Sequence, residues 1–172
     1  MIQRIQAVFT QLFDDIILVA NDVSAFSGLG MTVVTDIFPD RCSLAGLHSG
    51  LCHASHPYIC VSACDAPFVS YEIIKFMMGR MEPGIDILVP RSEGGLEPLA
   101  AIYSKSCIPK IEKQLENRLY RITSFYESAR IREIPERQLR RLDPQMRFTF
   151  NVNTPQDLET ANLMVQKNRK IV

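Results

Sequence analysis

An aspartate that follows an apolar run is the first residue in this sequence that could do chemistry. The stretch 58–68 opens as an apolar, β-prone run of the kind that forms a strand buried on both faces. It leads to Asp65, and Pro67 then ends the extended hydrogen bonding. Ligands of open α/β sheets bind beyond the carboxyl ends of the strands, where a lone carboxylate can hold a divalent metal ion. The motif alone fits equally well a plain turn in which Asp65 caps backbone amides.

Two further predicted strands also end in polar side chains. The apolar segments 16–20 and 31–35 are followed by Asn21 and Asp36. If the strands are parallel, their carboxyl ends lie at one edge of the sheet, so Asn21, Asp36 and Asp65 would share a rim. This repetition favours a functional interpretation of Asp65 over a plain turn.

The segment between Asp36 and the next strand predicts a helix over 44–52 with Ser43 as its N-cap. Gly46 and Gly50 lie four residues apart and leave a track without side chains, where a ligand or another backbone could come close. Glycine weakens a helix, so we expect either a packing or a binding reason for the pair.

The end of the chain carries two asparagines, Asn151 and Asn153. They are two residues apart, so in an extended segment their carboxamides share one face. Thr154 then predicts the cap of a last helix, with Pro155 at its first position. The preceding stretch 130–147 holds six arginines, for which we expect a solvated face, with a phosphate-binding patch as the alternative.

Composition excludes several functional classes. The 172 residues suffice for one domain with a core, expected to span 1–172. Nineteen basic residues balance nineteen acidic ones, which argues against nucleic acid or an anionic membrane as partner. The apolar runs are strand-sized, and the N-terminus lacks the layout of a signal peptide. Five cysteines without a CxxC motif indicate a reducing, cytoplasmic compartment, and their spacing does not favour zinc.

Alternating strand and helix patterns predict an α/β fold. The expected strands cover 16–20, 31–35, the start of 58–68, 86–90, 96–103 and 131–134. The expected helices cover 1–13, 44–52, 70–81, 108–115, 119–126 and the segment from 155. The link between 86–90 and 96–103 is too short for a crossover, so these two strands should be antiparallel.

Six motifs occur in an order and spacing that resemble one protein family. They are Ala20-Asn21-Asp22, Val34-Thr35-Asp36, Ser43-Leu44-Ala45-Gly46-Leu47, Ala63-Cys64-Asp65-Ala66-Pro67-Phe68, Leu96-Glu97-Pro98-Leu99 and Asn151-Val152-Asn153-Thr154-Pro155. Together they resemble the molybdenum cofactor guanylyltransferase family, also called molybdopterin-guanine dinucleotide biosynthesis protein A. The resemblance extends from about residue 1 to 165.

The resemblance implies a doubly wound, mostly parallel Rossmann-like sheet of the nucleotide-diphospho-sugar transferase type. It implies transfer of GMP from GTP to molybdopterin with release of pyrophosphate, assisted by Mg²⁺, with Mn²⁺ as a substitute. Other molybdenum cofactor biosynthesis proteins or molybdoenzymes are the implied protein partners. The alternatives are cytidylyl or sugar-phosphate nucleotidyl transfer, or a non-catalytic protein that binds the pterin.

The resemblance also assigns roles to residues of this sequence. Asp65 would hold the metal ion beside the α-phosphate and be the catalytic residue. The nucleotide would meet Asn21, Asp36 and the backbone of the turn that contains Leu44 and Gly46. Asn151 and Asn153 would lie on the molybdopterin side.

Two departures from the family accompany the match. Cys42 and Ser43 stand where the family usually has Gly-Pro. Family members begin with a strand and a glycine-rich loop that cradles the triphosphate, whereas this sequence resembles a form that starts within the following helix. The resemblance therefore implies an N-terminally truncated fold with unpaired strand edges and exposed apolar surface.

Overall fold

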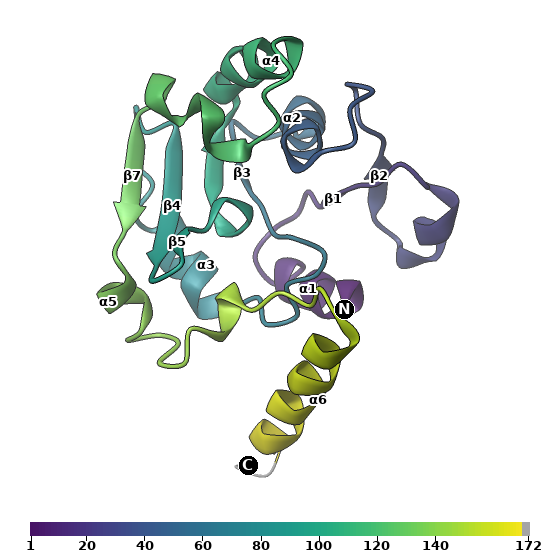
Figure 1. Cartoon of the computed structure of the whole chain (residues 1–172), viewed down its shortest axis with the longest axis vertical. Coiled ribbons are helices and arrows are strands. Elements are labelled where there is room, and N and C mark those ends of the chain that lie inside the picture. The colour runs from purple at the N-terminus through teal and green to yellow at the C-terminus, as the bar shows by residue number, and fades with distance from the viewer. Residues whose placement is uncertain (170–172) are drawn as a thin grey trace.

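The computed structural model describes residues 1–169, which fold into two sheets and their covering helices (Figure 1). The α-helices are α1 (Ile2–Phe9), α2 (Ser43–His53), α3 (Tyr71–Met78), α4 (Ile108–Glu116), α5 (Glu136–Leu139) and α6 (Pro155–Arg169). The strands are β1 (Ile17–Val19), β2 (Thr32–Val34), β3 (Tyr58–Cys60), β4 (Ile87–Ser92), β5 (Gly95–Leu96), β6 (Ile102–Ser104) and β7 (Ile131–Ile134). Short 3-10 helices cover Ser24–Leu29, Pro98–Ala100, Lys105–Cys107, Ile122–Ser128 and Arg147–Thr149.

The strands form two separate sheets. β1 and β2 pair in parallel as a two-stranded sheet. The larger sheet has the order β3-β6-β4-β5, with β7 parallel to β4 and β6 antiparallel to both β3 and β4. Within the described residues, β1 pairs only with β2 and β3 only with β6, so each keeps one free edge.

The predicted mostly parallel arrangement is wrong for the larger sheet, because β6 runs antiparallel between β3 and β4. No strand pairing joins β1 to β3 in the described chain, which agrees with the unpaired strand edges that the family resemblance implied. The expected antiparallel return after β4 is correct, but it is divided: β5 pairs with β4, the chain then turns at Pro98–Ala100, and β6 begins only at Ile102. Pro98 cannot donate to a strand ladder, which explains the break.

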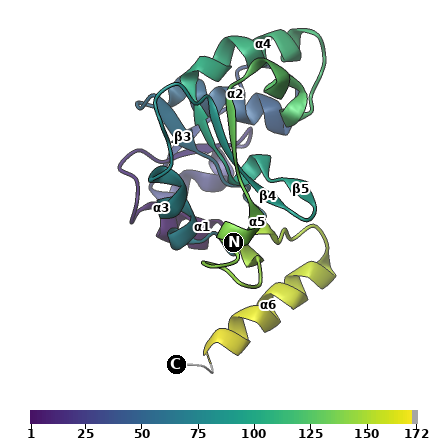
Figure 2. The same ribbon diagram turned by 90° about the vertical axis from the view of Figure 1, so that its left-hand side faces the viewer.

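Alternation along β4 divides the core into two layers. Ile87 and Val89 face the cluster formed with α2 and α4, whereas Leu88 faces the cluster formed with α3 and α5. All three side chains are fully buried. Figures 1 and 2 agree that α2 and α4 lie together at one end of the larger sheet, away from α1, α3 and α5. α2 also packs against β1 and β3 and so connects the two sheets.

Most predicted helices form, with one correction to an N-cap and one to the type and bounds of a helix. Ser70 and Thr154 accept the hydrogen bonds expected of caps, from the amides of Ile73 and Asp157. The N-cap of α2 is Cys42 rather than Ser43, because the Cys42 sulfur accepts from the amide of Ala45 over 3.4 Å. The helix predicted over 119–126 is instead the 3-10 helix Ile122–Ser128.

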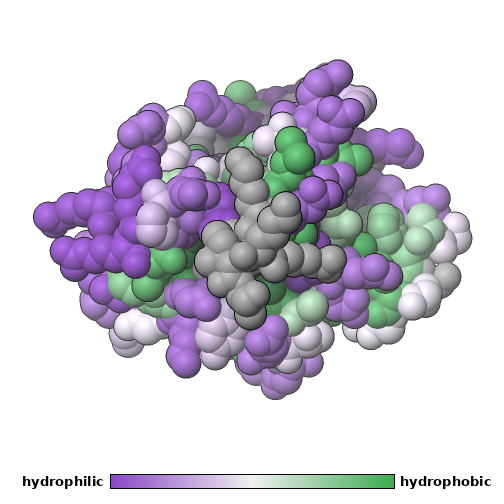
Figure 3. All heavy atoms as spheres, turned by 90° about the horizontal axis from the view of Figure 1, so that it is seen from below, coloured by the Kyte–Doolittle hydropathy of each residue, from purple (hydrophilic) through white to green (hydrophobic). Residues whose placement is uncertain are grey.

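α6 projects from the body of the molecule in both ribbon views. Its Leu158 and Leu163 are exposed, and Ala161 is buried. From this end of the molecule, Figure 3 shows a mainly hydrophilic surface with small, separate apolar patches. No helix among residues 1–169 combines the length and apolarity that crossing a bilayer requires.

Candidate functional site

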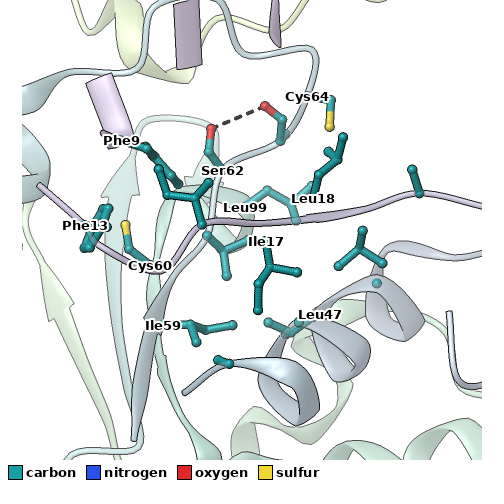
Figure 4. A pocket seen from close by; sticks show the side chains of 18 of the residues that line it. Phe9, Phe13, Ile17, Leu18, Leu47, Ile59, Cys60, Ser62, Cys64 and Leu99 are labelled. Atoms are coloured by element: carbon teal, nitrogen blue, oxygen red, sulfur yellow. Dashed lines mark hydrogen bonds between the residues drawn. The ribbon is translucent and has the colours of Figure 1, made fainter. Parts of the chain in front are cut away.

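A groove of about 940 Å³ runs between the two sheets. Its body is apolar: Figure 4 shows Ile17 and Leu18, Leu47 and Ile59 gathered around one space from β1, α2 and β3. Polar side chains line it as well, among them Asn21, Asp36, Arg41, Ser43 and Asp65. The volume matches pockets that hold small molecules. The three predicted rim residues, Asn21, Asp36 and Asp65, thus line a single groove.

Asn21 and Asp36 are in direct contact. They follow the paired strands β1 and β2, and the parallel pairing brings their ends together. Asn21 Nδ2 donates to Asp36 Oδ2 over 2.9 Å, and the Asp36 amide donates to Asn21 Oδ1 over 3.4 Å. This two-bond contact fixes how the Asp36 carboxylate is oriented.

The second carboxylate oxygen of Asp36 is left without a partner. Oδ1 is buried and accepts no hydrogen bond within the described chain. A buried acceptor without a donor costs about 1–3 kcal/mol, which suggests a site where a ligand supplies the donor. Gly46 borders this oxygen, since a methyl group there would lie 3.9 Å from it.

The Asp65 carboxylate is free to act on a ligand. It is half-buried, lines the groove and has no hydrogen bond or ion pair among the described residues. No group of three or more His, Cys, Asp or Glu side chains in residues 1–169 is arranged to hold a metal ion. One carboxylate still fits Mg²⁺, which keeps several waters and is commonly held by one or two carboxylates together with substrate phosphates.

Backbone pairing positions the segment that leads to Asp65. Beyond the end of β3, the amide of Val61 donates to the carbonyl of Ala101, and the amide of Ala63 donates to the carbonyl of Leu99. The chain then turns, and the Ala66 amide donates back to Ala63. The turn predicted at this motif is present, but the Asp65 side chain does not cap it.

The two late asparagines flank a residue that is bonded to this segment, but they lie outside the large groove. The Val152 amide donates to the Asp65 carbonyl over 2.9 Å, which holds the 151–153 segment against it. Asn151 lines a small cavity of about 40 Å³ together with Ser62 and Glu97, and neither asparagine lines the large groove. The segment is not a strand, so the shared face expected of an extended chain is not established.

Leu44 meets the groove only through its place in the turn. Its side chain is fully buried in the core cluster and does not line the groove, so any ligand contact would come from its backbone. No sequence motif pointed to Arg41, the one Lys or Arg among the groove residues that the structure describes. Arg41 is exposed and has no ion-pair partner in residues 1–169. The only feature of the sequence that could have indicated a role for Arg41 is its position just before the N-cap of α2.

The arginine-rich stretch 130–147 lies outside the groove. Four of its arginines form ion pairs with carboxylates of the described chain: Arg130 with Asp86, Arg132 with Glu82, Arg140 with Glu136 and Glu93, and Arg147 with Asp143. This pattern supports the solvated face over the phosphate-binding patch.

Two of the cysteines that line the groove, Cys60 and Cys64, have raised pKa values. Burial raises the pKa of the Cys60 thiol to about 12. Burial, and then the neighbouring Asp65 carboxylate, raise the pKa of the Cys64 thiol. Because the thiolate is the reactive form, these residues do not favour covalent thiol chemistry.

Comparison with known proteins identifies the family. The sequence-family model described as the MobA-like NTP transferase domain matches residues 1–131 of this chain. The chain belongs to this family. A molybdenum cofactor guanylyltransferase of Desulfosudis oleivorans is 38% identical over 169 residues, covering 98% of this chain and 84% of the relative. As a MobA-like protein, the chain is a nucleotidyltransferase.

Solved structures support the same α/β nucleotidyltransferase fold. Molybdopterin-guanine dinucleotide biosynthesis protein A from Archaeoglobus fulgidus superposes with a TM-score of 0.81 and 27% identity, covering 95% of this chain and 86% of the other. The 2-C-methyl-D-erythritol 4-phosphate cytidylyltransferase from Thermus thermophilus shares the fold, with a TM-score of 0.69 and 13% identity over 95% of this chain and 88% of the other. The predicted α/β nucleotidyltransferase fold is confirmed, although the strands form two separate sheets.

Proposed function

We propose that this MobA-like protein is a guanylyltransferase that joins GMP from GTP to molybdopterin and releases pyrophosphate. The observation that carries the proposal is the convergence of Asn21, Asp36, Gly46 and Asp65 on one groove large enough for a nucleotide. The name of the Desulfosudis oleivorans relative supports the choice of substrates. All five cysteines are free thiols, which is consistent with work in the reducing cytoplasm.

Asp36 is the proposed reader of the guanine base. Guanine presents two donors side by side, N1–H and the 2-amino group, and a carboxylate accepts such a pair well. Asp36 Oδ2 is engaged by Asn21, whereas the buried Oδ1 needs a donor. Cytosine presents its donor beside two acceptors, so it would satisfy this carboxylate less well.

Asp65 is the proposed metal ligand and catalytic residue. The reaction is an in-line attack by the terminal phosphate of molybdopterin on the α-phosphorus of GTP; the new P–O bond forms as the bond to pyrophosphate breaks. Such chemistry depends on positioning and on charge neutralisation. When bound to Asp65, Mg²⁺, or Mn²⁺ in its place, would neutralise charge on the phosphates.

The remaining residues would position the two substrates. Arg41 would face the negative charge of the triphosphate, together with the first amides of α2. Asn151 and Asn153 would contact the molybdopterin beside the segment that carries Asp65. The Val152–Asp65 bond would keep the two substrates in register.

The test combines turnover with base selectivity. Pyrophosphate release is measured with Mg²⁺, molybdopterin and either GTP or CTP. We expect turnover with GTP, and a loss on the order of a hundredfold or more in Asp65→Asn with an unchanged melting temperature. Preference for CTP would instead favour cytidylyl transfer, and pterin binding without nucleotide binding would favour a non-catalytic protein.

A further inference from the structure

Two of the buried polar residues of this structure are neighbours on α2, His48 and Ser49. Ser49 is completely buried, and its hydroxyl lies against the segment that follows β2. A hydroxyl in such a place costs free energy unless it is hydrogen-bonded, so its partner indicates what it does there.

The partner of Ser49 is the residue after the proposed base reader. The backbone amide of Ile37 donates to Ser49 Oγ over 2.8 Å. Asp36, one residue earlier, is held on its other side by Asn21. The peptide that carries the Asp36 side chain is therefore fixed from two directions, by the end of β1 and by α2.

His48 also holds the segment after β2 against α2, through a contact with Phe38. Its ring meets the ring of Phe38 edge to face, with centroids 5.0 Å apart. Its Nε2 lies 3.2 Å from Glu112 Oε1 on α4, so the imidazole is anchored as well. Residues 36–38 thus rest against consecutive side chains of one helix, which also carries Gly46 beside Asp36 Oδ1.

We propose that Ser49 is a positioning residue for nucleotide selection: by holding the Ile37 amide, it sets the angle at which the Asp36 carboxylate meets the guanine edge. This inference rests on the proposed function. It adds a residue remote from the ligand, since Ser49 does not line the groove among the residues described. A loosened Ile37 would let the Asp36 peptide rotate, and discrimination between bases would fall before binding of the phosphates did.

Equilibrium binding of GTP and ITP tests the role directly. ITP lacks the 2-amino group, so the ratio of the two Kd values reports contact with that edge of the base. We expect a preference for GTP in the wild type, its loss in Asp36→Asn, and a reduction of about fivefold in Ser49→Ala, as for one lost hydrogen bond. Ser49→Cys keeps a side chain of similar size with a weaker acceptor, so its preference for GTP should lie between those of the wild type and Ser49→Ala.

Ser124→Ala is the matched control. The Ser124 hydroxyl is buried without a hydrogen-bond partner in the described chain and does not line the groove, so the ratio should stay at the wild-type value. Hydrogen exchange of the Ile37 amide supplies a readout without nucleotide, and it should accelerate in Ser49→Ala alone.

The outcomes separate the two proposals. If the wild type binds GTP in preference to ITP and Asp36→Asn abolishes the preference, but Ser49→Ala leaves it unchanged, the positioning role is wrong and the guanylyltransferase proposal stands. If the wild type binds neither nucleotide or does not distinguish them, the proposed base reader fails and the role of Ser49 fails with it.

Discussion

The hydroxyl groups of Tyr103 and Tyr126 lie 2.7 Å apart in the core, and Tyr103 also donates to the carbonyl of Pro98 over 2.7 Å. Tyr103 is fully buried on β6, whereas Tyr126 comes from the distant 3-10 helix Ile122–Ser128. The pair fixes the Pro98–Ala100 turn, whose Leu99 carbonyl in turn accepts from Ala63 on the way to Asp65.

Removing one of these hydroxyls should therefore destabilise the fold. Tyr103→Phe leaves both the Pro98 carbonyl and the Tyr126 hydroxyl without their partner, and we expect a loss of about 1–3 kcal/mol in the free energy of unfolding. Tyr126→Phe leaves the Pro98 bond intact and should cost less. Urea unfolding measures both, and a larger loss in Tyr126→Phe would contradict this ranking.

The two glycines of α2 should respond differently to alanine. Both positions have room for a methyl group, with nearest contacts of 3.9 Å at Gly46 and 3.7 Å at Gly50, so each change should stabilise the helix by about 0.5–1 kcal/mol. At Gly46 the methyl group borders Asp36 Oδ1, whereas at Gly50 it meets Ile59 and Val19. We expect GTP binding to weaken about tenfold in Gly46→Ala only. Gly50 and its two contacts also line the groove, so equal weakening of GTP binding by both changes would contradict a specific role for Gly46 beside Asp36.

Arg41 should matter for the phosphates and not for the base. Arg41→Gln removes the one guanidinium among the described groove residues, and we expect the Kd of GTP to rise about threefold to tenfold while that of guanosine is unchanged. The dependence of GTP binding on salt should also decrease. Arg141→Gln removes the same charge from an exposed arginine outside the groove, so an equal loss in this control would point to a general effect of net charge.

Asp86 should give the fold a dependence on acid. Burial alone would raise the pKa of this carboxyl, but hydrogen bonds from the Arg130 amide, Lys110 and Ser106 outweigh burial and lower the pKa from 3.8 to about 2. A lowered folded-state pKa stabilises the fold above the unfolded value and stops doing so as the pH falls through the folded value. The contribution of Asp86, about 2 kcal/mol, should be present at pH 5 and lost near pH 2.

Urea unfolding at a series of pH values measures this effect. The difference in the free energy of unfolding between the wild type and Asp86→Asn should decrease as the pH falls from 5 toward 2. Lys110→Met breaks the same ion pair from the other side, over a contact of 2.7 Å, and should reduce the pH dependence in the same direction. Parallel curves for the wild type and Asp86→Asn would exclude the pairing as the cause.

Local patterns in the sequence predict much of this fold. The strand positions, the caps at Ser70 and Thr154, and the antiparallel return after β4 follow from hydrophobic runs, short polar side chains and link length. The free edges of β1 and β3 agree with the unpaired strand edges that the family resemblance implied. The antiparallel placement of β6 between β3 and β4 depends on which strands pair across long sequence distances, and local patterns contain no information on that. The cap at Cys42 was missed because a sulfur acceptor is rarely considered in this role.

The site was predictable where it depends on strand ends. Asn21, Asp36 and Asp65 line one groove, as their positions after strands indicated. The contacts of Ser49 and the exposure of Arg41 required the folded chain, because they depend on how α2 lies against the segment after β2. No sequence pattern distinguishes a serine with a positioning role from one that merely fills a small space in an apolar helix.

The free edges of β1 and β3 have a dynamic consequence. Since no backbone hydrogen bond joins these strands in the described chain, the β1–β2 pair is attached to the larger sheet mainly through α2 and apolar side chains. We expect this pair to behave as a separate cooperative unit that opens without melting β4, β6 and β7. In native-state hydrogen exchange, the amides of Ile17–Val19 would lose protection well before those of Ile87–Val89. Half of the groove wall, including Asn21 and Asp36, would thus move as one body when the protein admits or releases its nucleotide.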